Sequence, residues 1–241
     1  MKTFTPEELL CRLEWRRELR NIMGRISHDY AVKQEAEIYQ RYFSKRADVC
    51  LGLNNGYYQG AEAVAGYYRA LGEEIALSSR LIAQKFPEEL GGKTEEELYG
   101  VGMISYVPFE SHVIEIADDA QSAKGIWNIR GSTCHLTQGG PVANWIFGWA
   151  AVDFVMEDGE WKILHLLMLY NVDHQSGVGF CEEEKVFEPV PGFEEIAEFH
   201  LPEPNVPMNV FECYYPNRPR AKSPRYPEPY ETLDKTFSYG I

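Results

Sequence analysis

Four consecutive β-strand patterns between residues 104 and 171 constrain the fold more than any other part of the sequence. They cover about 104–117, 121–131, 144–157 and 160–171, and they are rich in Val, Ile, Trp and Tyr. These residue types are typical of a half-buried sheet. The turns "ADDAQS" and "EDGE" favour antiparallel hairpins, whereas "TQGGP" predicts a longer loop. The sequence therefore predicts a long antiparallel meander.

Three helical patterns precede these strands. The segment "TPEE" at residues 5–8 predicts a helix start, with a capping hydroxyl, a proline in the first turn and two acids. A second helical stretch covers about 34–46, and a third covers about 61–79. Asn-Gly at residues 55–56 indicates a tight hairpin between two short strands. This order predicts an α+β fold with helices over one sheet face.

Residues 181–241 differ in character from residues 1–180. Ten of the fourteen prolines lie between 189 and 229, among several aromatic residues. Proline at this density prevents regular sheet or helix, and a solvated linker would carry fewer aromatic side chains. We therefore expect one domain over 1–180 and an extended arm over 181–241 that packs on the same or a neighbouring subunit. Residues 80–102 predict a surface insertion with a short helix.

The composition argues against several classes of partner. A net charge of −14 opposes binding to nucleic acid or to an anionic membrane surface, because both need clustered Lys and Arg. No run approaches the roughly 18 apolar residues of a membrane span, and the first twenty residues lack the apolar segment of a secretory signal. The five cysteines form no C-x-x-C pair. We expect a cytoplasmic protein that uses neither a metal nor a cofactor.

One predicted strand carries a histidine among apolar residues. In "ESHVIEI", residues 110–116, strand alternation places His112, Ile114 and Ile116 on one face. Two interpretations fit: a hydrogen-bonded core histidine, or a base held in an apolar pocket. These seven residues alone favour the core histidine.

The segments "YYQGAEAVAGYY", "AKGIW" and "VDFVMEDGEWKILHLLMLY" carry a resemblance to a known family. They resemble SnoaL-like proteins of the nuclear-transport-factor-2-like superfamily, over about residues 8–175. The resemblance implies a cone-shaped α+β fold, in which a curved antiparallel or mixed sheet is covered by three N-terminal helices. It also implies a pocket between the concave sheet face and the first helices. The superfamily includes dehydratases, isomerases and non-catalytic modules, so the fold alone does not choose an activity.

The resemblance gives the histidine a possible role. It turns the face with Ile114 and Ile116 into the cone, which places His112 near the pocket rim as a general base. Asp29 would orient the ring and raise its basicity, and Tyr30 would donate to the developing oxyanion. The alternatives are a solvated Asp29 near a helix end and a Tyr30 that only packs in the core.

The sequence departs from the dehydratase pattern in the first helix. Those relatives carry a Tyr directly after a Gly-Lys or Gly-Arg pair and an Asp five residues later. After Gly24-Arg25 this chain has Ile26 and Ala31. Either residues 28–30 substitute from adjacent positions, or the activity is lost.

Three further residues are predicted to contact a substrate. His165 alternates with Trp161 and Ile163, so it is expected on the apolar strand face, where it could donate to a carbonyl oxygen. Trp127 could stack on a planar substrate, and Tyr58 could turn its hydroxyl toward the cavity. The alternatives are a structural His165 bonded to the backbone of a helix and plain core packing for Trp127.

The sequence and the resemblance together predict a cofactor-independent lyase or isomerase. Its substrate would be a hydrophobic cyclic small molecule, such as a steroid-like or polyphenol-like ketone or alcohol. The alternative is a non-catalytic small-molecule-binding or protein-assembly module of the same fold. The resemblance implies a homodimer or homotrimer formed through the outer sheet face, and the strand face with Trp145, Phe147 and Trp149 suits such an interface.

Overall fold

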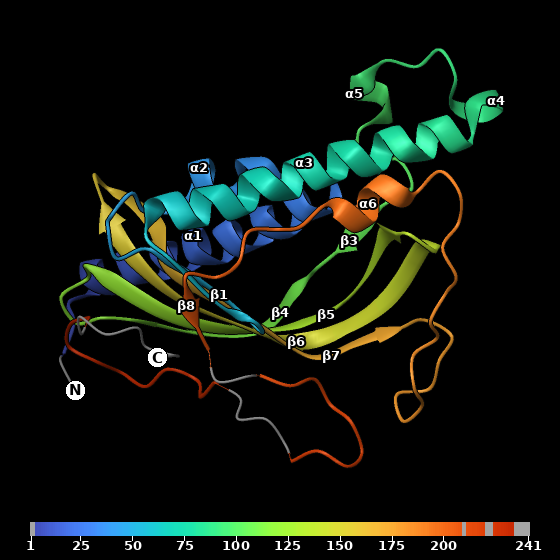
Figure 1. Cartoon of the computed structure of the whole chain (residues 1–241). Helices are drawn as coiled ribbons and strands as arrows, with labels where there is room; N and C mark the ends of the chain where they lie inside the picture. The colour runs from blue at the N-terminus through green and yellow to red at the C-terminus, as the bar shows by residue number, and fades with distance from the viewer. Residues whose placement is uncertain (1–2, 209–210, 220–223, 234–241) are drawn as a thin grey trace.

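Three helical segments lie over one face of a curved sheet in the computed structural model, which describes residues 3–208, 211–219 and 224–233 (Figure 1). They are α1 (Pro6–Ala31), the consecutive η1 (Glu35–Glu37) and α2 (Ile38–Tyr42), and α3 (Ala61–Lys85). The predicted α+β class with helices on one sheet face is confirmed.

The first helix begins where the sequence predicts it. The Thr5 hydroxyl accepts from the Glu8 N–H at 3.2 Å, and the Glu8 carboxylate accepts from the Thr5 N–H at 2.8 Å. This capping box satisfies two backbone donors at the helix start. The second segment ends earlier than predicted, because Phe43 has extended backbone and forms a β-bridge with Ile163.

The predicted 80–102 insertion starts inside a longer helix. Helix α3 continues to Lys85, and two single-turn helices follow, α4 (Pro87–Leu90) and α5 (Glu95–Leu98). None of the residues of α4 and α5 is buried. This part is therefore the surface elaboration that the sequence indicated, but it contains two short helices.

The sheet has eight strands in the described residues. They are β1 (Cys50–Leu53), β2 (Gly56–Gln59), β3 (Ile104–Tyr106), β4 (Phe109–Ile116), β5 (Ser122–Thr137), β6 (Gly140–Glu157), β7 (Glu160–Gln175) and β8 (Val206–Pro207). Their order is β3-β5-β6-β7-β1-β2-β8, and β4 also pairs with β5. Strand β1 runs parallel to β7, whereas the other pairs are antiparallel, so the sheet is mixed.

Two details of the meander differ from the prediction. The first predicted strand is divided into β3 and β4 by Val107 and Pro108. The "TQGGP" segment is a tight turn and not a longer loop, because Thr137 pairs with Gly140 at the end of the β5–β6 hairpin. Gly140 has φ 100°, which favours glycine.

A β-bulge in β7 reverses the strand alternation halfway along. Asp153 pairs with His165 but Phe154 pairs with Ile163, so Leu164 is an extra residue. Ile163 lies in the main core beneath the helices, whereas Leu167 lies in the core cluster on the opposite, convex face. His165 has the same alternation as Leu167, so it faces away from the helices.

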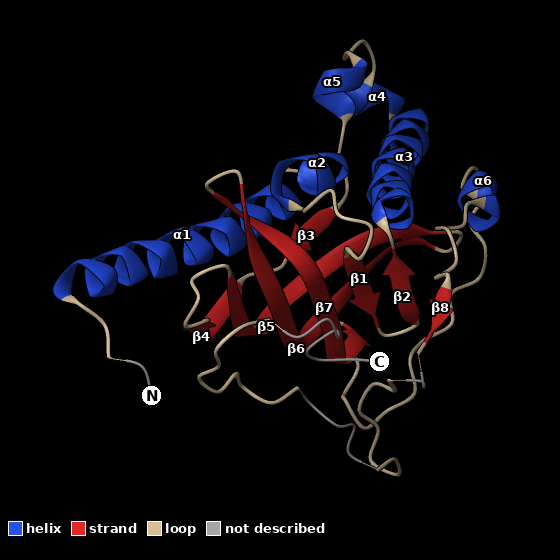
Figure 2. Ribbon diagram, turned by 90° about the vertical axis from the view of Figure 1, so that its left-hand side faces the viewer, coloured by secondary structure: helices blue, strands red, loops and turns tan. Residues whose placement is uncertain are grey.

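The described parts of the arm pack on their own chain. Helix α6 (Glu194–Glu198) lies beside α3, and β8 adds to the sheet edge at β2 (Figure 1). The arm then crosses the convex face, where Phe211 joins a cluster with Leu167 and Leu169 (Figure 2). Trp149 packs against this cluster, while Trp145 is 45% exposed. The division at residue 180 and the predicted homodimer or homotrimer stay predictions.

Substitution of Gly131 tests the close approach of β5 to the break between β3 and β4. A Cβ at this position of β5 would overlap the Tyr106 carbonyl oxygen. We expect Gly131→Ala to lower the free energy of unfolding by about 1–3 kcal/mol. Gly24→Ala is the matched control, since a Cβ at this position of α1 meets nothing within 4 Å. We expect it to raise the free energy of unfolding by about 0.5–1 kcal/mol. Urea unfolding measures both, and equal effects would contradict the close approach.

Candidate functional site

A cavity of about 300 Å³ lies between the helices and the concave face of the sheet. We call it the inner cavity. Its wall is mostly apolar and aromatic, with polar groups at a few positions, and it is lined by Tyr30, Glu35, Leu51, Leu53, Asn54, Asn55, Tyr67, Leu71, Ser105, Val107, Thr133, Met168, Tyr170 and Asp173. An apolar cavity with a few convergent polar groups is the usual form of a small-molecule site.

The buried carboxyl group of Glu35 is the most unusual polar group of this wall. Its side chain comes from η1, directly after α1 ends, and the residue is 3% exposed. Lys33 lies in the turn between the two helices with φ 62°, and its ammonium approaches Glu35 Oε1 at 3.4 Å. The same ammonium donates to Ser105 Oγ of β3 at 2.5 Å. One cation therefore holds Glu35 against α1 and the sheet.

Only one oxygen of this carboxyl group has a partner. Glu35 Oε2 is buried and has no hydrogen-bond partner within the described ranges. Burial raises the pKa of Glu35, although the Lys33 charge opposes the shift. A carboxylate with a raised pKa is a stronger base than one in water. The free oxygen, the burial and the cavity together give Glu35 the properties of a general base.

Several tyrosine hydroxyls share the cavity with this carboxyl group. Burial raises the pKa of Tyr30 and of Tyr67 well above the ordinary value, and it also raises that of Tyr170. These groups are therefore neutral hydrogen-bond donors over the physiological pH range. The Tyr30 hydroxyl lies 4.0 Å from Met168 Sδ, a weak acceptor. A hydroxyl with such a weak partner can turn toward a substrate oxygen.

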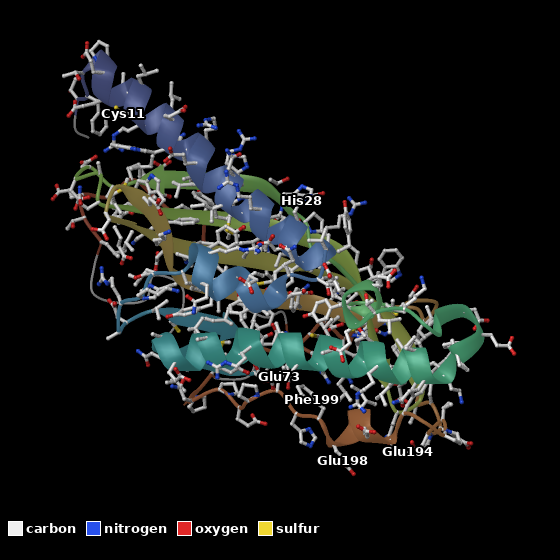
Figure 3. The ribbon with its side chains drawn as sticks, turned by 90° about the horizontal axis from the view of Figure 1, so that it is seen from above. Cys11, His28, Glu73, Glu194, Glu198 and Phe199 are labelled. Carbon is white, nitrogen blue, oxygen red and sulfur yellow. The ribbon has the colours of Figure 1, made fainter. Side chains whose placement is uncertain are left out.

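A second cavity, of about 410 Å³, adjoins the inner one. We call it the outer cavity. The two share Leu53, Asn55 and Tyr67, and the outer cavity is also lined by Tyr58, Glu74, Phe199, His200, Leu201, Pro202 and Glu203. Its lining combines α3 with the arm, and Figure 3 shows Phe199 on the segment that runs alongside α3.

A close helix contact brings the two cavities together. A Cβ on Gly72 of α3 would lie 2.9 Å from the Ala36 Cβ of η1. Only a residue without a side chain permits this approach, so Gly72 sets the distance between Glu35 of η1 and Glu74 of α3. Burial raises the pKa of Glu74, and the neighbouring Glu35 adds to this effect while Lys33 opposes it.

His112 lies outside both cavities. It is exposed, next to a bulge at which Ser111 has φ 47°, and its ring stacks on Trp127 with centroids 6.3 Å apart. Burial against this ring lowers the pKa of His112, and Arg20 and Arg16 of α1 lower it further. Ile114 is buried in the core as expected. The bulge and the arginines place the histidine at the outer sheet edge.

The structure does not bring Asp29 to His112. Asp29 Oδ2 accepts from the Tyr42 hydroxyl at 2.8 Å, and Oδ1 accepts from Arg41 Nη1 at 3.1 Å. Both partners come from α2, so this carboxylate joins α1 to α2. Among the predicted catalytic residues, only Tyr30 lines the inner cavity.

Ile26 and Ala31, the two positions at which the sequence departs from the dehydratase pattern, lie in different surroundings. Ile26 is fully buried in the main core, and Ala31 is exposed at the end of α1. The first helix therefore supplies apolar packing where the relatives carry a tyrosine. To the polar lining of the inner cavity, α1 contributes Tyr30, and the η1 segment after it contributes Glu35.

The prediction that His165 faces the pocket is wrong, because the bulge at Leu164 turns it to the convex face. There its Nδ1 lies 2.8 Å from Asp153 Oδ2, and its Nε2 lies 3.1 Å from the Asp48 carbonyl oxygen. The ring nitrogens thus connect β7 to β6 and to the residues before β1. The role is structural, as the alternative has it, but the partners are a β6 carboxylate and a loop carbonyl and not helix backbone.

The other two predicted contact residues, Trp127 and Tyr58, make most of their contacts with other parts of the protein. Trp127 is 2% exposed and packs edge-to-face on Phe154 at 6.1 Å, which is core packing. Tyr58 lines the outer cavity, but its hydroxyl donates to the Pro202 carbonyl oxygen at 2.7 Å. This hydroxyl therefore anchors the arm instead of pointing into free space.

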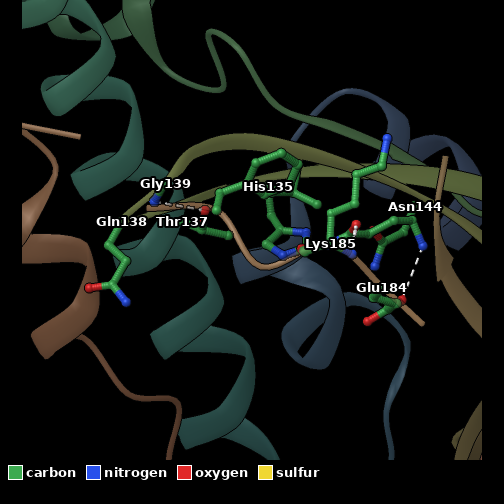
Figure 4. A pocket seen from close by; sticks show the side chains of 10 residues that line it. His135, Thr137, Gln138, Gly139, Asn144, Glu184 and Lys185 are labelled. Atoms are coloured by element: carbon green, nitrogen blue, oxygen red, sulfur yellow. Dashed lines mark hydrogen bonds between the residues drawn. The ribbon is translucent and has the colours of Figure 1, made fainter. Parts of the chain in front are cut away.

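A third cavity, of about 260 Å³, lies near the β5–β6 turn (Figure 4). His135, Asn144 and Gln175 of the sheet line it together with Glu184 and Lys185 of the arm. Burial lowers the pKa of His135. The arm side chains here are bonded to the sheet, since the Gln175 side chain exchanges two hydrogen bonds with the Lys185 backbone. This cavity has fewer apolar walls than the inner one.

The sequence contains a signal for Glu35 that a search for motifs misses. In "AVKQEAEIYQ" Glu35 precedes the buried Ile38 and Tyr39 by three and four residues, so it shares their helix face. An acid on an apolar face is a candidate for a perturbed carboxyl group. Within the described ranges no three acidic, His or Cys side chains are placed to hold a metal, and no helix could cross a membrane.

No protein-family model matches the sequence, and no characterised protein matches it significantly. Similar solved structures include hexachlorocyclohexane dehydrochlorinase LinA-type3 from Novosphingobium barchaimii LL02, with 14% identity, 73% of this chain and 97% of that chain covered, and a TM-score of 0.48. A candidate scytalone dehydratase from Novosphingobium aromaticivorans DSM 12444 has 11% identity, coverages of 75% and 95%, and a TM-score of 0.48.

An NTF2-like protein with a cystatin-like fold from Novosphingobium aromaticivorans is also similar, with 11% identity, coverages of 70% and 92%, and a TM-score of 0.40. At such identities a likeness concerns the fold and leaves the activity open.

The pH dependence of stability tests whether folding raises the pKa of Glu35. Its pKa is raised from 4.5 in the folded protein, so the unfolded chain loses this proton first. The free energy of unfolding should therefore fall, relative to the Glu35→Gln variant, as the pH rises above about 4.5, by about 1.4 kcal/mol for each unit of raised pKa. Urea unfolding between about pH 4 and pH 7 measures this.

Glu37→Gln serves as its control, since Glu37 is exposed in the same short helix. That variant should follow the parent protein at every pH. A parent protein that instead gains stability over Glu35→Gln as the pH rises would show that the Glu35 carboxylate is favoured by folding.

Proposed function

We propose that the protein is a cofactor-independent lyase or isomerase that moves a proton on a small cyclic substrate in the inner cavity. The observation that carries the proposal is the buried Glu35, which has one carboxyl oxygen without a hydrogen-bond partner among the described residues and lines the inner cavity together with Tyr30, Tyr67 and Tyr170. Enzymes that abstract a proton beside a carbonyl group need this pairing of a desolvated base with donors for the developing oxyanion.

The proton transfer would use the Glu35 carboxylate as the base and a tyrosine hydroxyl as the hydrogen-bond donor. Glu35 Oε2 takes a proton from a carbon beside a carbonyl group, and the electron pair moves to the carbonyl oxygen. The hydroxyl of Tyr30, Tyr67 or Tyr170 donates a hydrogen bond to that oxygen. The Glu35 acid then returns its proton, either to another carbon of the substrate or to a departing hydroxyl group. The first course is an isomerisation and the second is a dehydration.

The size and lining of the cavity support a small substrate with an apolar body. About 300 Å³ is the lower end of the range for ligand sites. Leu51, Val107 and Met168 provide apolar walls, and Asn54 and Thr133 provide polar groups at the side. Cyclic enones and hydroxy ketones combine an apolar ring with the carbonyl group that the chemistry requires.

Deuterium exchange tests this proposal whichever product the reaction forms. The protein is incubated in D₂O with a panel of cyclic enones and hydroxy ketones, and exchange at the carbon beside the carbonyl group is followed by NMR. We expect Glu35→Gln to lower the rate by a factor of about 10²–10⁴ and Tyr30→Phe to lower it by about 10–10³.

Two controls separate this assignment from its rivals. Glu37→Gln should keep the parent rate because its carboxylate is outside the cavity. His112→Gln should also keep it, since the imidazole lies at the outer sheet edge. Loss of exchange in His112→Gln with full activity in Glu35→Gln would return the base to His112. Binding without exchange in the parent protein would favour a non-catalytic binding module.

A further inference from the structure

The third cavity lies on the concave face of the sheet, beyond the inner cavity. His135 of β5 alternates with Thr133, which lines the inner cavity, so both side chains stand on the same face. Asn144 of β6 lies directly opposite Gln175 of β7 in the sheet register. Side chains that face each other across neighbouring strands lie close together. The ends of three strands therefore bring an imidazole and two amide groups into the wall of one cavity.

The arm forms the other side of the third cavity and is fixed there. The Gln175 side chain exchanges two hydrogen bonds with the Lys185 backbone, and the Gln175 N–H donates to Glu184 Oε1 at 3.1 Å. At the β5–β6 turn, the Val190 N–H donates to the Gln138 carbonyl oxygen at 2.7 Å. The arm is thus bonded to the sheet at both ends of the cavity, so the wall is formed before any ligand binds.

A close contact at the turn holds an aromatic ring in this wall. A Cβ on Gly139 would lie 2.6 Å from the Phe187 Cβ, so only a residue without a side chain permits this approach. Phe187 lines the cavity and is 48% exposed, so part of its side chain is open to a ligand. The face of such a ring packs on the C–H groups of a ligand, because contact removes apolar surface of both from water.

Three polar side chains of the lining have no hydrogen bond or ion pair with a described residue. They are His135, which is half-buried, and the exposed Gln138 and Lys185. Burial lowers the pKa of His135, although Asp173 opposes the shift, so at neutral pH the ring is uncharged and offers one donor and one acceptor. Figure 4 shows His135 in the middle of the lining, with Gln138 on one side and Asn144 on the other.

The charges of the lining favour an uncharged ligand. Glu184 and Lys185 are the charged residues of the described lining, and their charges cancel. A ligand with a charge would be attracted by one of them and repelled by the other. A hydroxyl group suits all of the polar groups present, since it both donates and accepts hydrogen bonds. The mixture of ammonium, carboxylate, amide and imidazole therefore matches a ligand with several hydroxyl groups.

We propose that the third cavity binds a monosaccharide or a similar neutral ring with several hydroxyl groups. His135, Gln138 and Lys185 form hydrogen bonds with its hydroxyl groups, and Phe187 packs on its C–H face. The volume of about 260 Å³ lies just below the usual range for drug-sized ligands, which suits a single sugar ring. The inference does not depend on the proposed reaction, because Glu35 is not part of this lining.

Binding of matched probes tests the class of ligand. Saturation-transfer NMR on the full chain compares glucose, galactose and mannose with cyclohexanol, anionic glucuronate and protonated glucosamine. We expect at least one of the three neutral sugars to give a saturable signal and to bind more tightly than cyclohexanol and both charged sugars. The absence of a saturable signal from all three neutral sugars, or tighter binding of a charged sugar, would overturn the proposal.

Matched variants locate the bound sugar. Phe187→Ala should weaken sugar binding by about threefold to tenfold, whereas Val186→Ala, at a neighbouring side chain that is 98% exposed and outside the lining, should leave it unchanged. His135→Phe and Gln138→Ala should each weaken it by a similar factor through lost hydrogen bonds. Gln138 and Phe187 are exposed, so these two variants are expected to fold, and melting temperatures check this.

Two results with these variants contradict the proposed site. One is a sugar affinity that equals the parent value in Phe187→Ala and Gln138→Ala. The other is sugar binding that is lost in Glu35→Gln, since this would place the sugar in the inner cavity. Sugar binding that depends on Phe187, with no proton exchange on any ketone, supports the third cavity and refutes the proposed reaction. Proton exchange that depends on Glu35, with no sugar bound, does the reverse.

Discussion

The enclosed ammonium of Lys33 is the contact on which the candidate site depends. It joins the turn after α1 to Glu35 of η1 and to Ser105 of β3, so one charge connects the helical layer to the sheet. Burial lowers the pKa of Lys33, so the charge is costly, and its two oxygen partners offset part of that cost. Without this cation, the buried Glu35 carboxyl group would lose its only ion-pair partner among the described residues.

Local signals predicted the elements of the fold well. The capping segment at residues 5–8, the Asn-Gly turn at 55–56 and the strand patterns after residue 104 each act over a few residues, so they are visible in the sequence. The missed features depend on tertiary structure. The extra residue Leu164 is indistinguishable from its apolar neighbours in sequence, and only the pairing of β7 with β6 shows that it reverses the face of His165.

The site was predicted less well than the fold for the same physical reason. The superfamily resemblance predicts a His112–Asp29 pair, but a bulge beside His112 and the α2 partners of Asp29 keep the two residues apart. Tyr30 lines the inner cavity, as predicted, because it continues the apolar stripe of the first helix. Glu35 shares a helix face with only Ile38 and Tyr39, so its periodicity signal is short and is missed by a search for motifs.

The outer cavity can be completed only after the sheet has formed, because part of its wall belongs to the arm. Helices α1 to α5 and the long strands lie before residue 176, whereas Phe199, Pro202 and Glu203 of the cavity wall follow them in the chain. A chain that emerges from the ribosome N-terminus first can form its sheet and its inner cavity before these residues exist. The arm then docks on a finished surface, through the Tyr58 hydroxyl and the β2–β8 pairing. The outer cavity is thus completed only after the sheet and the inner cavity, when residues 199–203 have been made and have docked.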